Sequence, residues 1–412
     1  MKRFSSFSAT FVVLALLHAV ATKDLRIVTE PKNPVICTSL NATSDDDTET
    51  IQKALNSCTK GQAVALTSGN TFNTGPLTIP SDVSLLVEKG ALLKAIPNPK
   101  LYDKGANTCG WYDDNGNGCN AFITILKANG SGIYGEGTID GQGGAHINSQ
   151  KLTWWKLIRR ANELNKRANN PRLIHINDST DITLYQIVLK NSPQFHVAST
   201  QTYGLTLWKV IIYSPKATSD TDGVVLEGSQ NVTIAHTNIT TVSDNIGITA
   251  SDAPSKHISM YNLHLNRGYG ISIGGATKHG ISNVNFSNLT LTIVNYGINI
   301  RSNTLNGGPV TNITYHNVCL YRVWYPIVLD MFYGNVTGDQ KPQFKNIFLN
   351  EVYAGNSGNY IFHGIDESDP IEVELNDVHV AKGSSWSVSK AEVTGNWKYD
   401  LRERHCPHNV NI

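Results

Sequence analysis

Short runs of alternating apolar and polar residues fill most of the chain. From Asp181 onward, apolar positions alternate with Asn, Thr, Ser or His, as strands with one inward and one outward face require. The runs begin about 22 to 29 residues apart, an interval typical of repeat architectures, and Gly and Asn mark the corners. Hairpin turns such as Asn-Gly between paired runs are rare, which argues against a sandwich. The pattern predicts an all-β, single-stranded right-handed parallel β-helix.

Two segments break this pattern. Acidic residues at positions 45–49 precede Ile51, Leu55 and Cys58 at helical spacing, which predicts a short amphipathic helix. One helix ahead of a solenoid would cap the apolar end of the stack. The basic, helix-favouring stretch WWKLIRRANELNKRANN predicts an insertion, a loop with one or two helical turns. With no linker-like stretch elsewhere, we expect residues 22–412 to form a single domain.

The first residues have the features of a secretory signal peptide. A basic start, an apolar run from Phe11 to Leu17 and the small residues Ala19–Ala21 predict a leader over residues 1–21. The apolar run is too short to span a bilayer, and no later segment is long and apolar enough to do so. We therefore expect a secreted, extracellular protein without membrane association, and a monomer as the default for this architecture.

Composition narrows the classes of partner. The formal net charge is +1, and no basic run is present that would neutralise several phosphates, so nucleic-acid binding is not expected. Six cysteines fit an oxidising compartment; Cys109 with Cys119 is the preferred pairing, and Cys37 with Cys58 the next. No cluster has metal-ligand spacing, so we expect no metal and no cofactor. Glycosylation acceptors, some of which we expect to be unused, occur at Asn41, Asn129, Asn177, Asn231, Asn238, Asn285, Asn288, Asn312 and Asn335.

Four polar segments recur within the repeats. They read DTDG (220–223), SDN (243–245), GYG (268–270) and NIR (299–301). Equivalent positions of successive solenoid turns stack side by side, so these segments should line one shallow surface. His196, His257 and His279 are interpreted as surface or corner residues.

In order and spacing, these segments resemble the polygalacturonases of glycoside hydrolase family 28, with a bacterial-type look. GTIDGQGG (137–144), NSPQFHV (191–197) and GYGISIG (268–274) extend the resemblance over nearly the whole mature chain. It implies an inverting hydrolase that cleaves α-1,4-galacturonosyl linkages of pectin. One carboxylic acid protonates the leaving oxygen while carboxylates on the other side activate water. It also implies a pectic polysaccharide as partner, with plant polygalacturonase-inhibiting proteins as a second class.

The family pattern is Asn-Thr-Asp, Asp-Asp, Gly-His-Gly and Arg-Ile-Lys, and this chain keeps only part of it. By resemblance, Asp222 and Asp244 are the water-side carboxylates, whereas Ser243 stands where the acid should be. Other departures are Asp220 for Asn, Tyr269 for His, Asn299 for Arg and Arg301 for Lys. The candidate catalytic residues are therefore Asp222, Asp244 and Asp220. The candidate substrate-binding residues are Tyr269, Arg301, Asn299 and Ser243.

These departures give three hypotheses. A serine hydroxyl cannot act as a general acid at a working pH, and loss of such an acid removes about 10² to 10⁴ in rate, so we favour a catalytically impaired pectin-directed protein. The alternative is an active hydrolase of a modified pectin, such as xylogalacturonan or rhamnogalacturonan, with Asp220 as substitute acid. If positions 220 and 222 alternate onto one strand face, two neighbouring carboxylates would raise one pKa. The preferred interpretation of Asp220 is that it only caps a turn beside Gly223. A purely structural solenoid ranks last because Asp222, Asp244 and Arg301 remain.

Overall fold

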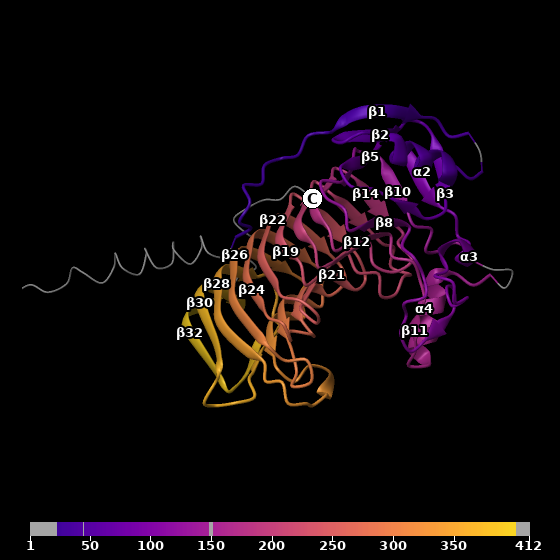
Figure 1. The fold of residues 1–412 in the computed structure, drawn as a ribbon. Coiled ribbons are helices and arrows are strands. Elements are labelled where there is room, and N and C mark those ends of the chain that lie inside the picture. The colour runs from indigo at the N-terminus through magenta and orange to yellow at the C-terminus, as the bar shows by residue number, and fades with distance from the viewer. Residues whose placement is uncertain (1–22, 44, 148–150, 401–412) are drawn as a thin grey trace, which may run out of the picture.

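The computed structural model describes residues 23–43, 45–147 and 151–400. The chain winds into stacked coils whose strands form two long sheets with parallel pairing, as a β-helix requires (Figure 1). The predicted parallel β-helix is confirmed. The predicted leader at 1–21 lies outside the described residues.

The smaller sheet has eleven strands among the described residues. From the N-terminal to the C-terminal end of the stack they are β4 (Leu77–Thr78), β8 (Ile123–Leu126), β12 (Ile174–Asn177), β15 (Val197–Thr200), β18 (Val224–Glu227), β21 (Asp244–Thr249), β23 (Gly270–Gly274), β25 (Tyr296–Arg301), β27 (Tyr325–Asp330), β29 (Asn359–His363) and β31 (Ser385–Ser389).

The larger sheet has nineteen strands in the same part of the chain. In chain order they are β1 (Val35–Leu40), β2 (Gln62–Leu66), β3 (Thr71–Thr74), β5 (Val83–Val87), β6 (Leu92–Ala95), β9 (Gly132–Tyr134), β10 (Thr138–Asp140), β13 (Thr180–Tyr185), β14 (Val188–Lys190), β16 (Tyr203–Trp208), β17 (Ile211–Tyr213), β19 (Gln230–Ala235), β20 (Asn238–Thr240), β22 (Ser255–Asn266), β24 (Ile281–Thr292), β26 (Pro309–Tyr321), β28 (Gln343–Ala354), β30 (Ile371–Ala381) and β32 (Ala391–Asp400).

The core is a stack of aliphatic side chains inside the coils. In the eleven-stranded sheet, one inward position is occupied on successive strands by branched residues that are at most 1% exposed. Because side chains alternate across a strand, the next residue on each strand points outward. The outward positions are Val225, Gly247, Ser272 and Asn299. The hydrophobic register therefore fixes which polar side chains line the outer face.

The predicted N-terminal helix is confirmed as α2 (Thr48–Ser57), which buries Ile51 and Leu55. It packs on the first coils beside β2 and β4. The bridge between Cys37 and Cys58 joins β1 to the residue that ends α2. The first strands are thus tied to their cap.

The predicted helical insertion is also confirmed. It forms α4 (Trp154–Glu163). The strand that follows α4, β11 (Arg167–Ala168), pairs antiparallel with the earlier strand β7 (Tyr112–Asp113). Together these elements project from the coils on one side of the eleven-stranded sheet, opposite the loops of the C-terminal coils (Figure 1). Two shorter helical turns complete the helices of the described chain, α3 (Pro99–Tyr102) and η1 (Tyr333–Asn335).

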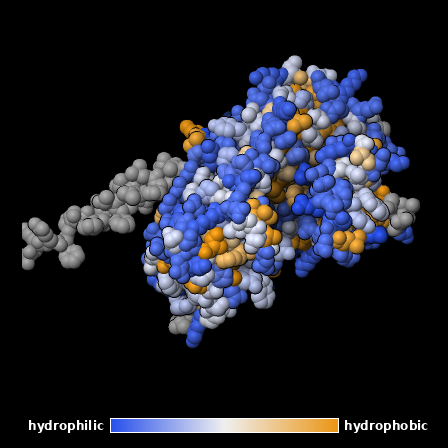
Figure 2. All heavy atoms as spheres, turned by 60° about the horizontal axis from the view of Figure 1, so that its bottom comes forward, coloured by the Kyte–Doolittle hydropathy of each residue, from blue (hydrophilic) through white to orange (hydrophobic). Residues whose placement is uncertain are grey.

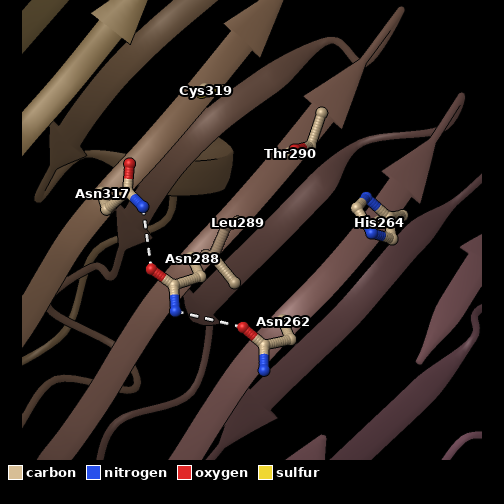
Figure 3. Close-up of a pocket in the computed structure, with 7 residues that line it drawn as sticks. All are labelled: Asn262, His264, Asn288, Leu289, Thr290, Asn317 and Cys319. Carbon is tan, nitrogen blue, oxygen red and sulfur yellow. Dashed lines mark hydrogen bonds between the residues drawn. The ribbon is translucent and has the colours of Figure 1, made fainter. Parts of the chain in front are cut away.

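Asparagine ladders hold one row of corners together. Asn317 donates to Asn288 at 2.8 Å and Asn288 donates to Asn262 at 3.1 Å (Figure 3), and the three residues have φ between 55° and 56°. Left-handed backbone is tolerated best by Gly and Asn. Because the Asn288 amide is used within the ladder and Asn231 is only 1% exposed, we expect neither to carry a glycan in the folded state.

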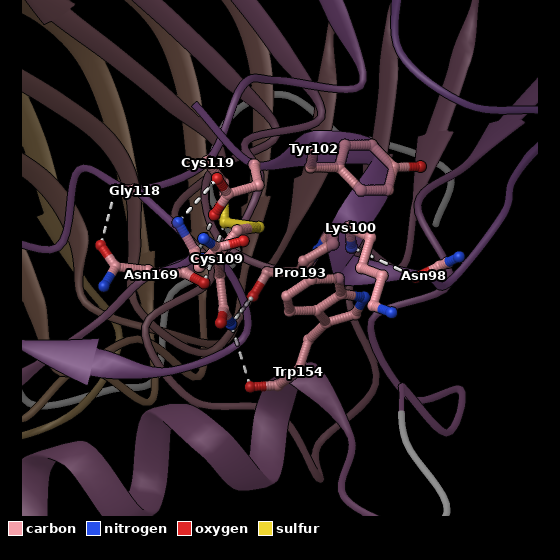
Figure 4. The surroundings of a disulfide bond; sticks show 12 residues. Asn98, Lys100, Tyr102, Cys109, Gly118, Cys119, Trp154, Asn169 and Pro193 are labelled. Atoms are coloured by element: carbon pink, nitrogen blue, oxygen red, sulfur yellow. Dashed lines mark hydrogen bonds between the residues drawn. A yellow bond between two sulfur atoms is a disulfide. The ribbon is translucent and has the colours of Figure 1, made fainter. Parts of the chain in front are cut away.

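Both predicted cysteine pairings are confirmed. Cys109 and Cys119 close a loop beside Tyr102, Trp154 and Asn169 (Figure 4), and Cys319 is disulfide-bonded as well. In the described part of the chain, no helix has the length and apolar character needed to cross a membrane.

Candidate active site

The outer face of the eleven-stranded sheet is the floor of a groove. Figure 2 shows this face hollowed between the α4 side and the C-terminal coils. The predicted polar segments enter the floor on neighbouring coils, at the starts of β18, β21 and β23 and at the end of β25. The structure therefore brings together residues that are far apart in the sequence, such as Asp244 and Arg301, which are 57 positions apart. This is what the repeat spacing predicts if each repeat forms one coil.

Asp222 and Asp244 stand next to each other. The Gly223 N–H donates to the Asp244 carbonyl at 2.9 Å, which places the two aspartates at equivalent positions of adjacent coils, about 4.8 Å apart along the axis. Burial and the Asp244 carboxylate raise the pKa of Asp222, and the Ser243 hydroxyl, which donates to Asp222, opposes the rise. One proton is therefore held at this pair at a pH where an ordinary aspartate has lost it.

Asp244 is held from both sides. The Ser272 hydroxyl donates to its Oδ1 at 2.8 Å, and Arg301 Nη2 donates to its Oδ2 at 2.9 Å. Burial raises the pKa of Asp244, while Arg301 and Ser272 lower it. Of the two carboxylates, Asp244 is thus the one that is paired with a cation.

His196 supports this pair from beneath. Its backbone N–H and its ring Nδ1 both donate to the Asp222 carbonyl at 2.9 Å, and its Nε2 lies 3.3 Å from Ser214 Oγ. Burial lowers the pKa of His196 to about 4, so the ring is neutral and its Nδ1 carries the proton. His196 lies in a corner directly before β15, as one half of the interpretation has it, but it is not a surface residue, because it is 0% exposed.

Ser243, which the sequence resemblance aligns with the family's acid, lies directly before Asp244. Its carbonyl accepts a hydrogen bond from the Tyr269 N–H at 2.9 Å. Gly268 has φ +79°, and a Cβ there would lie 2.2 Å from the Ser243 carbonyl oxygen. The backbone at position 243 is therefore fixed by its neighbours.

Asp220 does not lie where strand alternation would put it. It sits in a turn ahead of β18 with φ +47°, it is exposed, and its Oδ2 accepts a hydrogen bond from Asn162 of α4 at 2.7 Å. The argument that positions 220 and 222 share a strand face is therefore wrong. Asp220 is nonetheless near enough for its charge to add to the raised pKa of Asp222.

Asn299 lies beneath the groove surface. It is 2% exposed, and its amide donates to Ser272 Oγ at 3.2 Å. Because Ser272 in turn donates to Asp244, Asn299 is placed to position Asp244 and not to contact a sugar. Arg301 is only partly accessible as well, since it is paired with Asp244 and its guanidinium lies 4.5 Å from the Tyr333 ring centre.

A row of tyrosines continues from Tyr269. Tyr269, Tyr296 and Tyr325 occupy one position on successive coils, with ring centres 6.3 and 5.1 Å apart. Tyr269 is 39% exposed. Tyr296 and Tyr325 are not among the predicted site residues. Each lies two residues before the first inward isoleucine of its run, as Tyr269 does, and this shared position could have identified them from the sequence.

Comparison with known proteins agrees with this geometry. The model of the glycosyl hydrolases family 28 matches residues 42–397. The chain belongs to glycosyl hydrolase family 28. Within family 28, an endo-polygalacturonase of Pectobacterium parmentieri is 40% identical over 396 residues, which cover 95% of this chain and 98% of that protein. The solved polygalacturonase of Erwinia carotovora ssp. carotovora is 39% identical, with a TM-score of 0.86, over 90% of this chain and all of that one (100%).

The fold is shared with more distant members as well. An exopolygalacturonase of Thermotoga maritima superposes with a TM-score of 0.71 at 18% identity, over 93% of this chain and 95% of that one. The family resemblance seen in the sequence is thus confirmed. No group of His, Cys, Asp and Glu suited to a metal ion occurs in the described ranges.

Proposed function

We propose that this chain is a secreted, pectin-directed member of family 28 that binds polygalacturonate in the groove and hydrolyses it only slowly. The observation that carries the proposal is the pair Asp222 and Asp244 with Ser243 beside it. Relatives at 40% identity that cover nearly the whole chain are named endo-polygalacturonases, which supports pectin as the ligand. Secretion is proposed from the leader-like residues 1–21 and from the disulfide bridges.

The proposed impairment follows from where the carboxylates lie. Inverting glycosidases need a proton donor and a base on opposite sides of the bond, with about 6.5 to 9.5 Å between the two carboxyl groups. Asp222 and Asp244 stand on adjacent strands, which suits two groups on the same, water-activating side. The departing glycosidic oxygen would then face Ser243, whose hydroxyl is far too weak an acid to transfer its proton at a working pH.

A second candidate function is an active hydrolase in which Asp222 itself donates the proton. It is favoured by the pKa of Asp222, which burial and the Asp244 carboxylate raise, whereas Arg301 and Ser272 oppose the rise that burial causes in the pKa of Asp244. Two titratable groups whose environments push their pKa values apart are the usual acid and base of an active site.

The experiment is a reducing-end assay on polygalacturonate across the pH range, with binding measured by gel retardation in pectin. Retardation with little release of sugar supports the first candidate. Rapid release that is abolished by Asp222→Asn, and that falls as the pH rises through the Asp222 pKa, supports the second. Neither retardation nor release would refute both.

A further inference from the structure

A second polar position of the groove lies two coils before the aspartate pair. The Leu173 N–H donates to the Phe195 carbonyl, and the His196 N–H donates to the Asp222 carbonyl, both at 2.9 Å. Arg172, Phe195 and Asp222 are therefore equivalent residues of three successive coils. Arg172 lies about 10 Å from Asp222 along the axis, toward the N-terminal end, at two strand spacings.

Arg172 is a cation without an anion. Among the described residues it makes no ion pair and no side-chain hydrogen bond, and its Nε is buried without a partner. Its guanidinium lies 5.9 Å from the Phe195 ring centre, and burial lowers its pKa. An arginine that is partly buried and unpaired destabilises the folded state, so packing alone does not account for it.

A second cation, Lys104, is near enough to Arg172 for the two charges to act on each other. Lys104 precedes the loop closed by Cys109 and Cys119, and its N–H donates to the carbonyl of Gly118 in that loop at 3.1 Å. Burial and the charge of Arg172 both lower the pKa of Lys104. No described carboxylate forms an ion pair with Lys104 either.

The third titratable group at this place is neutral. Burial, Arg172 and Lys104 together lower the pKa of His175 to about 4. His175 and Ala198 occupy the outward position of β12 and β15, so His175 is part of the groove floor. Among the described residues, the groove before Asp222 thus holds two cations that form no ion pair.

We propose that Arg172 and Lys104 bind the carboxylate of a uronate unit, upstream of the sugar that lies over Asp222 and Asp244. A guanidinium group donates two parallel hydrogen bonds to a carboxylate, and a lysine adds a point charge. This site would supply the recognition of acidic sugars that Asn299, buried, cannot give. The inference rests on the proposed function, because it takes polygalacturonate as the ligand.

The test is calorimetric titration of the full-length protein with hexagalacturonate and, separately, with its fully methyl-esterified form. Reducing ends are counted in the same samples. We expect wild type to bind the acid form at least about tenfold more tightly than the ester, a difference of about 1.4 kcal/mol. Arg172→Met should abolish this preference, Lys104→Gln should reduce it, and Arg172→Lys should retain part of it.

A matched control is Lys60→Gln, which removes a lysine whose side chain is 79% exposed and which pairs with Asp82 away from the groove. It should leave the preference unchanged. The thermal midpoint of Arg172→Met should equal or exceed that of wild type, whereas a structural arginine would lower it on removal. Lys104→Gln alters an exposed side chain, so it tests the site even if Arg172→Met fails to fold.

The outcomes separate the two proposals. If wild type prefers the acid form and Arg172→Met and Lys104→Gln keep that preference, the upstream site is refuted and pectin binding stands. If wild type binds neither oligomer, both proposals fail.

Discussion

Replacing Ser243 by Asp is the most direct test of the missing acid. The side chain would enter a position whose backbone is held by the Tyr269 N–H and by the close approach of Gly268, so the exchange should leave the coil intact. The new carboxyl would lie beside Asp222 and Asp244, and like charges at that distance raise a pKa. It should therefore keep its proton near neutral pH and serve as the donor.

The expected gain follows from the general acid alone. Proton donation typically contributes about 10² to 10⁴ in rate, which corresponds to about 2.7 to 5.4 kcal/mol of barrier. Ser243→Asp should thus raise kcat on polygalacturonate by about two orders of magnitude or more, and restoring the second position with Tyr269→His should not lower it. Stability should fall as the pH rises, since a third carboxylate must then ionise beside two others.

The assay counts reducing ends released from polygalacturonate by wild type, Ser243→Asp and Ser243→Asn. The asparagine variant has the same shape as the aspartate variant but no proton to give, so it should stay at the wild-type rate. The reasoning is refuted if Ser243→Asp and Ser243→Asn are equally slow while both still bind pectin. It is also refuted if wild type already cleaves as fast as the aspartate variant.

Three further outcomes can be measured on the purified protein. Because burial raises the pKa of Asp222 in the folded state, the protonated carboxyl stabilises the fold fully below the unfolded pKa, and this stabilisation is lost as the pH rises through the folded pKa. Asp222→Asn should therefore raise the thermal midpoint more at pH 8 than at pH 4. The corresponding difference in unfolding free energy is about 1.4 kcal/mol for each unit between the two pKa values, and an equal shift of the midpoint at both pH values would contradict this. His196→Ala removes the ring donor to the Asp222 carbonyl while the backbone N–H of residue 196 still donates to it, and loss of this hydrogen bond should cost about 0.5 to 1.5 kcal/mol of unfolding free energy by chemical denaturation; His196→Asn, whose amide can replace Nδ1, should recover part of that stability and of any activity, and equal losses would argue against the hydrogen bond. Gly268→Ala should destabilise the protein by at least about 1 kcal/mol, because φ is +79° and the new Cβ would meet the Ser243 carbonyl; an unchanged denaturation midpoint would show that the turn can relax.

Much of the fold could be predicted because a solenoid repeats its local rules. Each run has the same alternation, so the inward and outward positions of one coil apply to the next, and the positions of Asp222 and Asp244 on one face followed directly. The helices over 48–57 and 154–163 were predictable because their apolar residues recur at helical spacing.

The errors have a common physical origin in the corners. Strand alternation was applied to Asp220, but a left-handed turn precedes β18 and rotates that side chain toward α4. Exposure is likewise not readable from alternation alone: Asn299 points outward and is still covered, and His196 lies in a corner that is filled by the Asp222 carbonyl and Ser214. The unpaired Arg172 could not be anticipated because its lack of a partner is a property of the packed coils.

The contact between α4 and the turn before Asp222 links two parts of the groove that differ in origin. Besides the Asn162 bond, Arg159 donates to the Ala217 carbonyl at 3.2 Å, so the inserted helix is fastened at two points to the segment that leads into the aspartate pair. A polysaccharide that binds to α4 and displaces it would also shift the turn before Asp222, without contacting Asp222 itself. Exchanges on the distal wall of the groove can therefore alter the chemistry at its centre, and evolution could adjust the turnover of this protein by editing an insertion while every coil stays as it is.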